Sequence, residues 1–293
     1  MRTLSYLPLG LLLAAAIVAS ADAADARKYT LRYKFHDGET LRWQVAHRNN
    51  TRTSVSGTTK NAETSSKSVK LWRVKEVKSD GSAVFEHLVE NVDMRHQMTG
   101  HPEVRYNSRT DKKPPTGYQQ VAKSVGVPLS KITMDVRGRV VRRDKKVEQS
   151  KENPGCITVP LPEEPIPIGH TWSFPHEIQA KLNSGGIKRI KALQTFTLKR
   201  VKTGVATIDV ATRILTPIQD PALESQVMQY RSRGTVRFDI DAGRVLGQQM
   251  DVDQHVVGFS GQASSLHYLN RFTEELLRGP VRTAGRSTQG SKR

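Results

Sequence analysis

The feature that most constrains the fold of this chain is a period of two in its apolar residues. Over residues 29–35, Tyr, Leu, Tyr and Phe alternate with Thr, Arg and Lys, and the alternation resumes over residues 41–45 after the turn pair Asp37-Gly38. Successive side chains of a β-strand point to opposite faces, so this period is typical of half-buried strands. Glycine turns recur along the chain and predict antiparallel neighbours.

Two segments carry apolar residues at helical spacings of three and four. Residues 117–126 follow a pair of prolines and end at a glycine, which predicts a short helix. Residues 264–277 contain four leucines and Phe272 at similar spacings, so we expect a short terminal helix, although the same segment could extend the last strand. The sequence therefore predicts an all-β fold with one or two short helices.

Three turn blocks occur twice in the same order, which indicates an internal repeat. The paired blocks are residues 37–43 with 168–174, 71–84 with 198–208, and 132–141 with 236–246. They predict two duplicated, curved antiparallel β units, packed as a half-barrel or barrel-like structure or as two small β domains. The alternative is a chance recurrence of Gly, Thr and Val, which are common in any β protein.

The chain begins with the pattern of a cleaved secretory signal peptide. Arg2 precedes an apolar run over residues 7–18, and small-x-small cleavage sites follow near residue 23. A retained anchor is the alternative, but the run is short for a membrane span. We expect an exported protein, periplasmic or extracellular, that is soluble after cleavage. The expected parts are a signal peptide (1–23), a first β unit (24–143), a Pro-rich charged linker (144–168), a second β unit (169–278) and a disordered basic tail (279–293).

The charge balance predicts an anionic partner. Lys and Arg number 46 against 28 Asp and Glu, a formal charge of +18, and such a field attracts anions. An envelope polymer or lipid head groups are the expected targets; nucleic acid is not, because stacking aromatics are sparse around the basic residues. The alternative is that the charge only aids solubility. The predicted polyanion-binding residues are Arg137, Arg139, Arg142, Arg143, Lys145, Lys146, Lys188, Arg189 and Lys191.

Two further groups of residues are candidates for binding. Met94, His96 and Met98 would share one face of a strand, and thioether with imidazole suits a soft ion such as Cu(I). The alternative is that the methionines fill the core. The three tryptophans could line a cavity inside the curved sheet: Trp43, Trp72 and Trp172.

No catalytic constellation is found, so we expect no enzyme, no catalytic residues and no cofactor. The single cysteine, Cys156, lacks the context of a catalytic thiol and leaves no internal disulfide. We expect a binding protein or adaptor for an apolar or anionic envelope component. The alternatives are a structural scaffold held on an anionic partner by its basic surface and, more remotely, a hydrolase.

The chain also resembles a family of secreted bacterial β-rich proteins with no known activity. The resemblance rests on the Gly-Glu-Thr-Leu-Arg-Trp block at residues 38–43, the segment from Val125-Gly126 to Gly138-Arg139-Val140, and the Pro-Ile-Pro-Ile-Gly-His-Thr-Trp run at residues 165–172. It covers roughly residues 29–260, and the family's usual opening is replaced here by Phe-His-Asp-Gly. The resemblance implies export and a β-rich fold, and it implies no functional residues.

Overall fold

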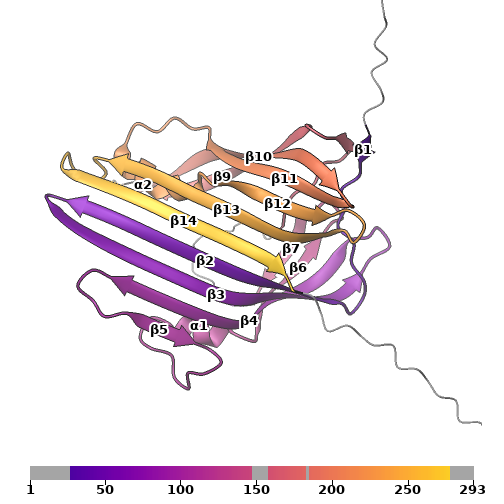
Figure 1. Cartoon of the computed structure of the whole chain (residues 1–293), viewed down its shortest axis with the longest axis horizontal. Helices are drawn as coiled ribbons and strands as arrows, with labels where there is room; N and C mark the ends of the chain where they lie inside the picture. The colour runs from indigo at the N-terminus through magenta and orange to yellow at the C-terminus, as the bar shows by residue number, and fades with distance from the viewer. Residues whose placement is uncertain (1–26, 147–157, 183–184, 278–293) are drawn as a thin grey trace, which may run out of the picture.

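The protein is built around one large antiparallel sheet (Figure 1). The computed structural model describes residues 27–146, 158–182 and 185–277. Among these residues, twelve strands form one sheet and two short strands pair separately. The sheet is not closed, and the predicted all-β class is confirmed. The expected signal peptide (1–23), the expected tail (279–293) and Cys156 lie outside the described residues.

The strands follow one another as a meander in each half of the chain. The first half contains β2 (Thr40–Val55), β3 (Thr58–Val77), β4 (Ala83–Met98), β5 (Val104–Asn107), β6 (Pro128–Met134) and β7 (Val140–Lys145). The second half contains β9 (Thr171–Lys181), β10 (Ile187–Lys202), β11 (Val205–Ile214), β12 (Arg233–Asp239), β13 (Arg244–Val257) and β14 (Ser264–Leu276). The order across the sheet is β7-β6-β4-β3-β2-β14-β13-β12-β11-β10-β9, and β5 adds to β4.

The two halves share one continuous sheet, because β14 pairs with β2 along 13 residues. Figure 1 shows the yellow β14 lying beside the indigo β2, so the first and last sheet strands of the chain are neighbours. The paired turn blocks fall at equivalent places: the second pair joins β3 to β4 and β10 to β11, and the third joins β6 to β7 and β12 to β13. That the two halves superpose as a duplicated unit stays a prediction.

The prediction of a short helix over residues 264–277 is wrong. Residues 264–276 form strand β14, which pairs with β13 on one side and β2 on the other. The leucines at helical spacing coincide with a second pattern, since Leu266, Phe272 and Leu276 also fit a period of two. Two partner strands satisfy every backbone group in the ladder, so the tertiary context overrides the local spacing.

Two short helices interrupt the strands. The first, α1 (Gln119–Ser124), lies inside the predicted segment 117–126. The second, α2 (Pro221–Val227), was not predicted; the carboxylate of Asp220 accepts a hydrogen bond from the Ala222 N–H at 2.9 Å, and Pro221 stands at the first position. A 3-10 turn, η1 (Met228–Tyr230), follows directly. Leu223 and Val227 of α2 pack on buried residues of β9 and β10.

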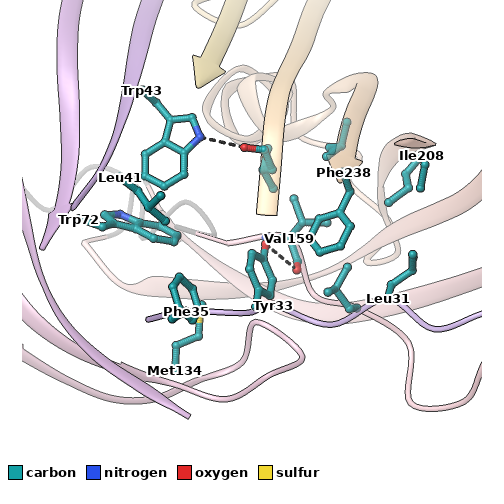
Figure 2. Packing of buried hydrophobic residues seen from close by; sticks show 14 of the residues in the cluster. Leu31, Tyr33, Phe35, Leu41, Trp43, Trp72, Met134, Val159, Ile208 and Phe238 are labelled. Atoms are coloured by element: carbon teal, nitrogen blue, oxygen red, sulfur yellow. Dashed lines mark hydrogen bonds between the residues drawn. The ribbon is translucent and has the colours of Figure 1, made fainter. Parts of the chain in front are cut away.

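The main core lies at one end of the sheet, beneath a strap formed by residues 28–36 (Figure 2). Leu31, Tyr33 and Phe35 of the strap are buried, as the period of two predicts. Tyr33 accepts the Val159 N–H at 3.0 Å through its hydroxyl, and that hydroxyl lies 3.2 Å from the Val159 carbonyl. The strap begins with β1 (Lys28–Tyr29), which pairs with β8 (Ile166–Pro167).

The expected linker 144–168 contributes to this core where it is described. Val159, Leu161 and Ile166 are buried in the same cluster as the strap residues. The middle of the expected linker, residues 147–157, lies outside the described residues. Residues 158–167 therefore form a second strap, which packs against the core beside the first.

Candidate functional site

The three tryptophans occupy two different environments. Trp43 and Trp72 are buried, with ring centroids 4.8 Å apart, and the Lys70 ammonium lies 4.6 Å and 4.9 Å from their rings. The void beside them measures about 10 Å³, room for about one water molecule. Trp172, in contrast, is only half-buried, on the edge strand β9. Only Trp172 therefore borders a space that a ligand could enter.

A hollow of about 370 Å³ opens beside Trp172. It lies in the size range of small-molecule sites, and apolar side chains dominate its lining. We call it the Trp172 hollow. Its lining residues are Arg137, Arg139, Pro160, Leu161, Pro162, Glu163, Glu164, Pro165, Ile166, His170, Trp172, Ser173 and Phe174.

The hollow forms because the two ends of the open sheet meet the same strap. The N–H of Leu161 donates to the Arg137 carbonyl at 2.8 Å, which ties the strap to the β6–β7 turn. The Trp172 indole N–H donates to the Pro160 carbonyl at 2.8 Å, which ties the same strap to β9. Since β7 and β9 are the terminal strands of the sheet order, the strap residues 158–167 bridge its two edges.

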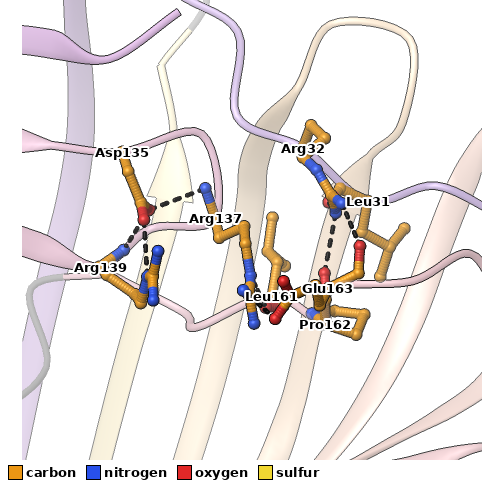
Figure 3. A network of polar contacts seen from close by, with 8 residues as sticks. All are labelled: Leu31, Arg32, Asp135, Arg137, Arg139, Leu161, Pro162 and Glu163. Atoms are coloured by element: carbon orange, nitrogen blue, oxygen red, sulfur yellow. Dashed lines mark hydrogen bonds and ion pairs between the residues drawn. The ribbon is translucent and has the colours of Figure 1, made fainter. Parts of the chain in front are cut away.

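Polar contacts hold one wall of the hollow (Figure 3). Arg137 donates to the Leu161 carbonyl at 3.3 Å and pairs with Glu163 at 2.7 Å. Arg32 of the first strap donates to the Pro162 carbonyl at 2.8 Å and also to the Glu163 carbonyl. These contacts fix the backbone of the second strap, so the wall is formed before any ligand arrives.

Arg139 is the most accessible cation of this wall. Its Nε donates to Asp135 at 2.6 Å, while the side chain stays 60% exposed. Partial burial alone would raise the pKa of Asp135, but hydrogen bonds from the Arg139 side chain and from the backbone N–H groups of Arg139 and Arg137 lower that pKa overall. Asp135 therefore stays ionised and orients Arg139, whose remaining N–H groups can reach a ligand.

Two of the predicted basic residues border the Trp172 hollow, and the others lie on or beside strands β7 and β10. Arg137 and Arg139 border the Trp172 hollow. Arg142, Arg143 and Lys145 lie on β7 and Lys146 follows it, whereas Lys188, Arg189 and Lys191 lie on β10, near the opposite end of the sheet order. Several are paired, such as Arg142 with Asp144 at 3.0 Å and Arg189 with Glu177 at 3.6 Å. Polyanion binding by the whole set stays a prediction.

The candidate copper ligands share a face of β4, opposite residues 62–66 of β3 in the ladder. Met94 packs at the margin of the cluster around Tyr106 and Tyr118. The Nδ1 of His96 lies 3.1 Å from the Thr64 hydroxyl. In the part of the chain that the structure describes, no group of three His, Cys, Asp or Glu residues could hold a metal ion. Copper binding by methionine and histidine stays a prediction.

Sequence reasoning missed how the prolines contribute to the site. The proline and charge content of the segment predicts a linker that includes Pro160, Pro162 and Pro165. Proline holds an extended backbone without needing a hydrogen-bond partner for its nitrogen, which suits a strap beneath a sheet. The usable signal was the apolar alternation Val159, Leu161 within the same run.

Comparison with models of known protein families and with curated proteins gives no match. The resemblance to a secreted bacterial family therefore stays a prediction. No helix within residues 27–146, 158–182 and 185–277 has the length and apolar character needed to cross a membrane.

Among solved structures, the chain is similar to lipovitellin, to the β domain of the Bordetella autotransporter BrkA and to DynF from the dynemicin biosynthesis pathway of Micromonospora chersina. The lipovitellin match has a TM-score of 0.43 and 11% identity and covers 84% of this chain, which spans about a quarter (26%) of lipovitellin. The BrkA domain gives 0.33, 8% identity and coverage of 80% and 98%. DynF gives 0.21, 6% identity and coverage of 88% of each chain. These TM-scores lie below 0.5, and such likenesses say nothing about function.

Proposed function

We propose that this protein is an exported, non-enzymatic binding protein for an amphiphilic envelope component that carries one apolar group and one acidic group. The observation that carries the proposal is the Trp172 hollow, an apolar space with the accessible Arg139 at its rim. The apolar group would lie against Trp172 and Phe174. The acidic group would reach Arg139.

The charges of the hollow favour one acidic group over many. Arg137 pairs with Glu163 and Arg139 with Asp135, and Glu164 lines the same hollow, so the wall has no excess of positive charge. A densely charged polymer would meet these carboxylates as well as the arginines. A single acidic group can bind Arg139 while the apolar part supplies most of the binding free energy.

The second candidate function is a scaffold held on its partner by charge. It is favoured by the filled core around Trp43 and Trp72, which leaves no cavity for cargo there. It is disfavoured by the ion pairs that several of the predicted basic residues already make, such as Arg142 with Asp144 and Arg189 with Glu177. The binding protein remains our first proposal.

The test uses two fluorescent probes that differ by one acidic group. 1-Anilinonaphthalene-8-sulfonate has an aromatic body and a sulfonate, and N-phenyl-1-naphthylamine has the same body without it. We expect Trp172→Leu to weaken binding of both probes by about tenfold or more, because a large aromatic contact is lost. Arg139→Gln should weaken only the sulfonate probe, by about tenfold, because a charge-assisted hydrogen bond is lost.

Arg142→Gln is the matched control, since Arg142 is an exposed arginine of β7 paired with Asp144 and lies outside the hollow. It should leave both affinities unchanged. Thermal unfolding of each variant checks that the fold persists, because Trp172 stacks on Phe196 at 5.5 Å. If Trp172→Leu bound each probe as tightly as the unchanged protein does, the hollow would not be the binding site.

A further inference from the structure

A broad hollow lies on the face of the sheet that points away from the core. It measures about 1020 Å³ and crosses β4, β3, β2, β14 and β13. Trp43 and Val45 face the core, so alternation along β2 places Arg48 and Asn50 on the opposite face. Most of the other lining side chains alternate in the same way, and we call this space the outer hollow.

Two arginines stand directly opposite each other at the centre of the outer hollow. Arg48 of β2 pairs in register with Arg271 of β14. Directly opposed residues in an antiparallel ladder have Cβ atoms about 5 Å apart, and like charges there are destabilising. Arg271 pairs with Asp251 at 2.6 Å, whereas Arg48 has no ion pair or side-chain hydrogen bond to any residue that the structure describes. The arrangement places two positive charges side by side, and of the two only Arg271 is held in an ion pair.

The rim of the outer hollow carries both charges: Lys67, Arg95 and Arg105 line it together with Glu63, Asp93, Asp251 and Asp253. Ser65 lies opposite Arg48 on β3, and Asn50 donates to Glu63 at 3.2 Å. Asp93 and Asp253 lie at the two ends of the hollow, on β4 and β13. The hollow has no aromatic residue other than His47 in its lining. An apolar ligand would find little to bind here.

We propose that the outer hollow binds an acidic oligosaccharide in which isolated carboxylates are separated by neutral sugar residues. One carboxylate would accept hydrogen bonds from Arg48 and from the free N–H groups of Arg271, a fork geometry that arginine offers to carboxylates. Sugar hydroxyls would donate to the carboxylates of Glu63 and Asp253. The ligand thus matches a cationic centre with a rim that carries acidic as well as basic side chains.

Sparse charge is the discriminating property of this ligand. A dense polyanion would place negative charge against Glu63, Asp93, Asp251 and Asp253, which line the same hollow. A neutral sugar would leave the opposed arginines without an anion. The inference is independent of the Trp172 hollow, which lies on a different part of the molecule and takes an apolar group.

The test titrates the full mature chain with sialyllactose, which carries one carboxylate on a trisaccharide, by calorimetry. Maltotriose serves as the neutral trisaccharide and polyphosphate as the dense polyanion. We expect sialyllactose to bind and maltotriose to show no measurable binding. Arg48→Gln should weaken sialyllactose binding by about tenfold or more, the loss expected for hydrogen bonds to a charged group.

Arg52→Gln is the matched control. Arg52 lies on the same strand and the same face, four residues further along, and is exposed outside the hollow. It should change the affinity by less than about twofold, because exposed charges at that distance are screened. Equal losses in the two variants would overturn the proposal, as would equal binding of maltotriose. Failure of sialyllactose to bind, or tighter binding of polyphosphate with a steep salt dependence, would also overturn it.

Discussion

The two ends of strands β2 and β3 lie in one ladder but face very different surroundings. At the strap end, Leu41, Trp43 and Trp72 are buried in the aromatic core. Further along the same face, β2 continues with Asn49 and Thr51, which are only half-buried. The backbone pairing is uninterrupted between β2 and β3, so the difference lies in what covers the sheet.

Along a single strand, side-chain packing therefore changes while backbone pairing continues without interruption. The strap end gains its stability from apolar side chains beneath two straps. The far end relies on the ladder itself, with neighbouring strands on both sides of β2 and β3. Stability should therefore be concentrated at the strap end, while polar binding surface is available at the other.

The largest effect should come from emptying the aromatic core. Phe85 is fully buried and stacks on Trp72 with ring centroids 4.5 Å apart. Phe85→Ala should lower the free energy of unfolding by about 3–5 kcal/mol, measured by urea titration. The control is Leu269→Ala at the far end, where the side chain is 38% exposed; it should cost less than about 1 kcal/mol. Similar losses in both variants would refute the contrast between the two ends.

A pH effect of intermediate size should arise at His87, beside the core. Burial, with the nearby charges of Lys70 and Arg143, lowers its pKa from 6.5 to about 3. The folded protein therefore keeps His87 neutral where the unfolded chain takes up a proton. Its contribution to stability is fully present above pH 6.5 and is lost as the pH falls toward 3, a loss of about 3 kcal/mol by pH 4.

His87→Gln removes this titration. The free energy of unfolding, measured by urea titration at pH 7 and pH 4, should then fall less between the two values than in the unchanged protein. The difference between the two pH values isolates the proton from any packing change, because packing acts at both. An unchanged pH dependence in the variant would show that His87 does not titrate as proposed.

The smallest effect should be a gain in stability at the end of β2 that lies away from the straps. Arg48→Thr removes one of two directly opposed arginines and introduces a residue that favours strands. We expect the free energy of unfolding to rise by about 0.5 kcal/mol at low salt, and the gain to shrink as salt screens the repulsion. Arg52→Thr controls for strand propensity alone. A loss of stability in Arg48→Thr would mean that Arg48 stabilises the fold, and that its repulsion with Arg271 does not lower the free energy of unfolding.

Local properties were predictable from the sequence because they depend on near neighbours. The alternation over residues 29–35 identified side chains that are buried, and Gly57, with its positive φ of 82°, closes the β2–β3 hairpin as a glycine turn should. The short helix near residue 120 followed from its spacing and its flanking prolines. Of the Trp172 hollow, Trp172, Arg137 and Arg139 were each singled out, but their meeting was not predicted.

Contacts between distant segments were decided only by the tertiary structure. Residues 264–276 became a strand because β2 and β13 offered partners on both sides, and this pairing alone places Arg48 against Arg271. Residues 158–167 became the wall of a hollow because the two sheet edges meet on them. A strand can pair with any exposed edge, so local pattern sets which face is apolar, while the choice of partner depends on the packing of the whole chain.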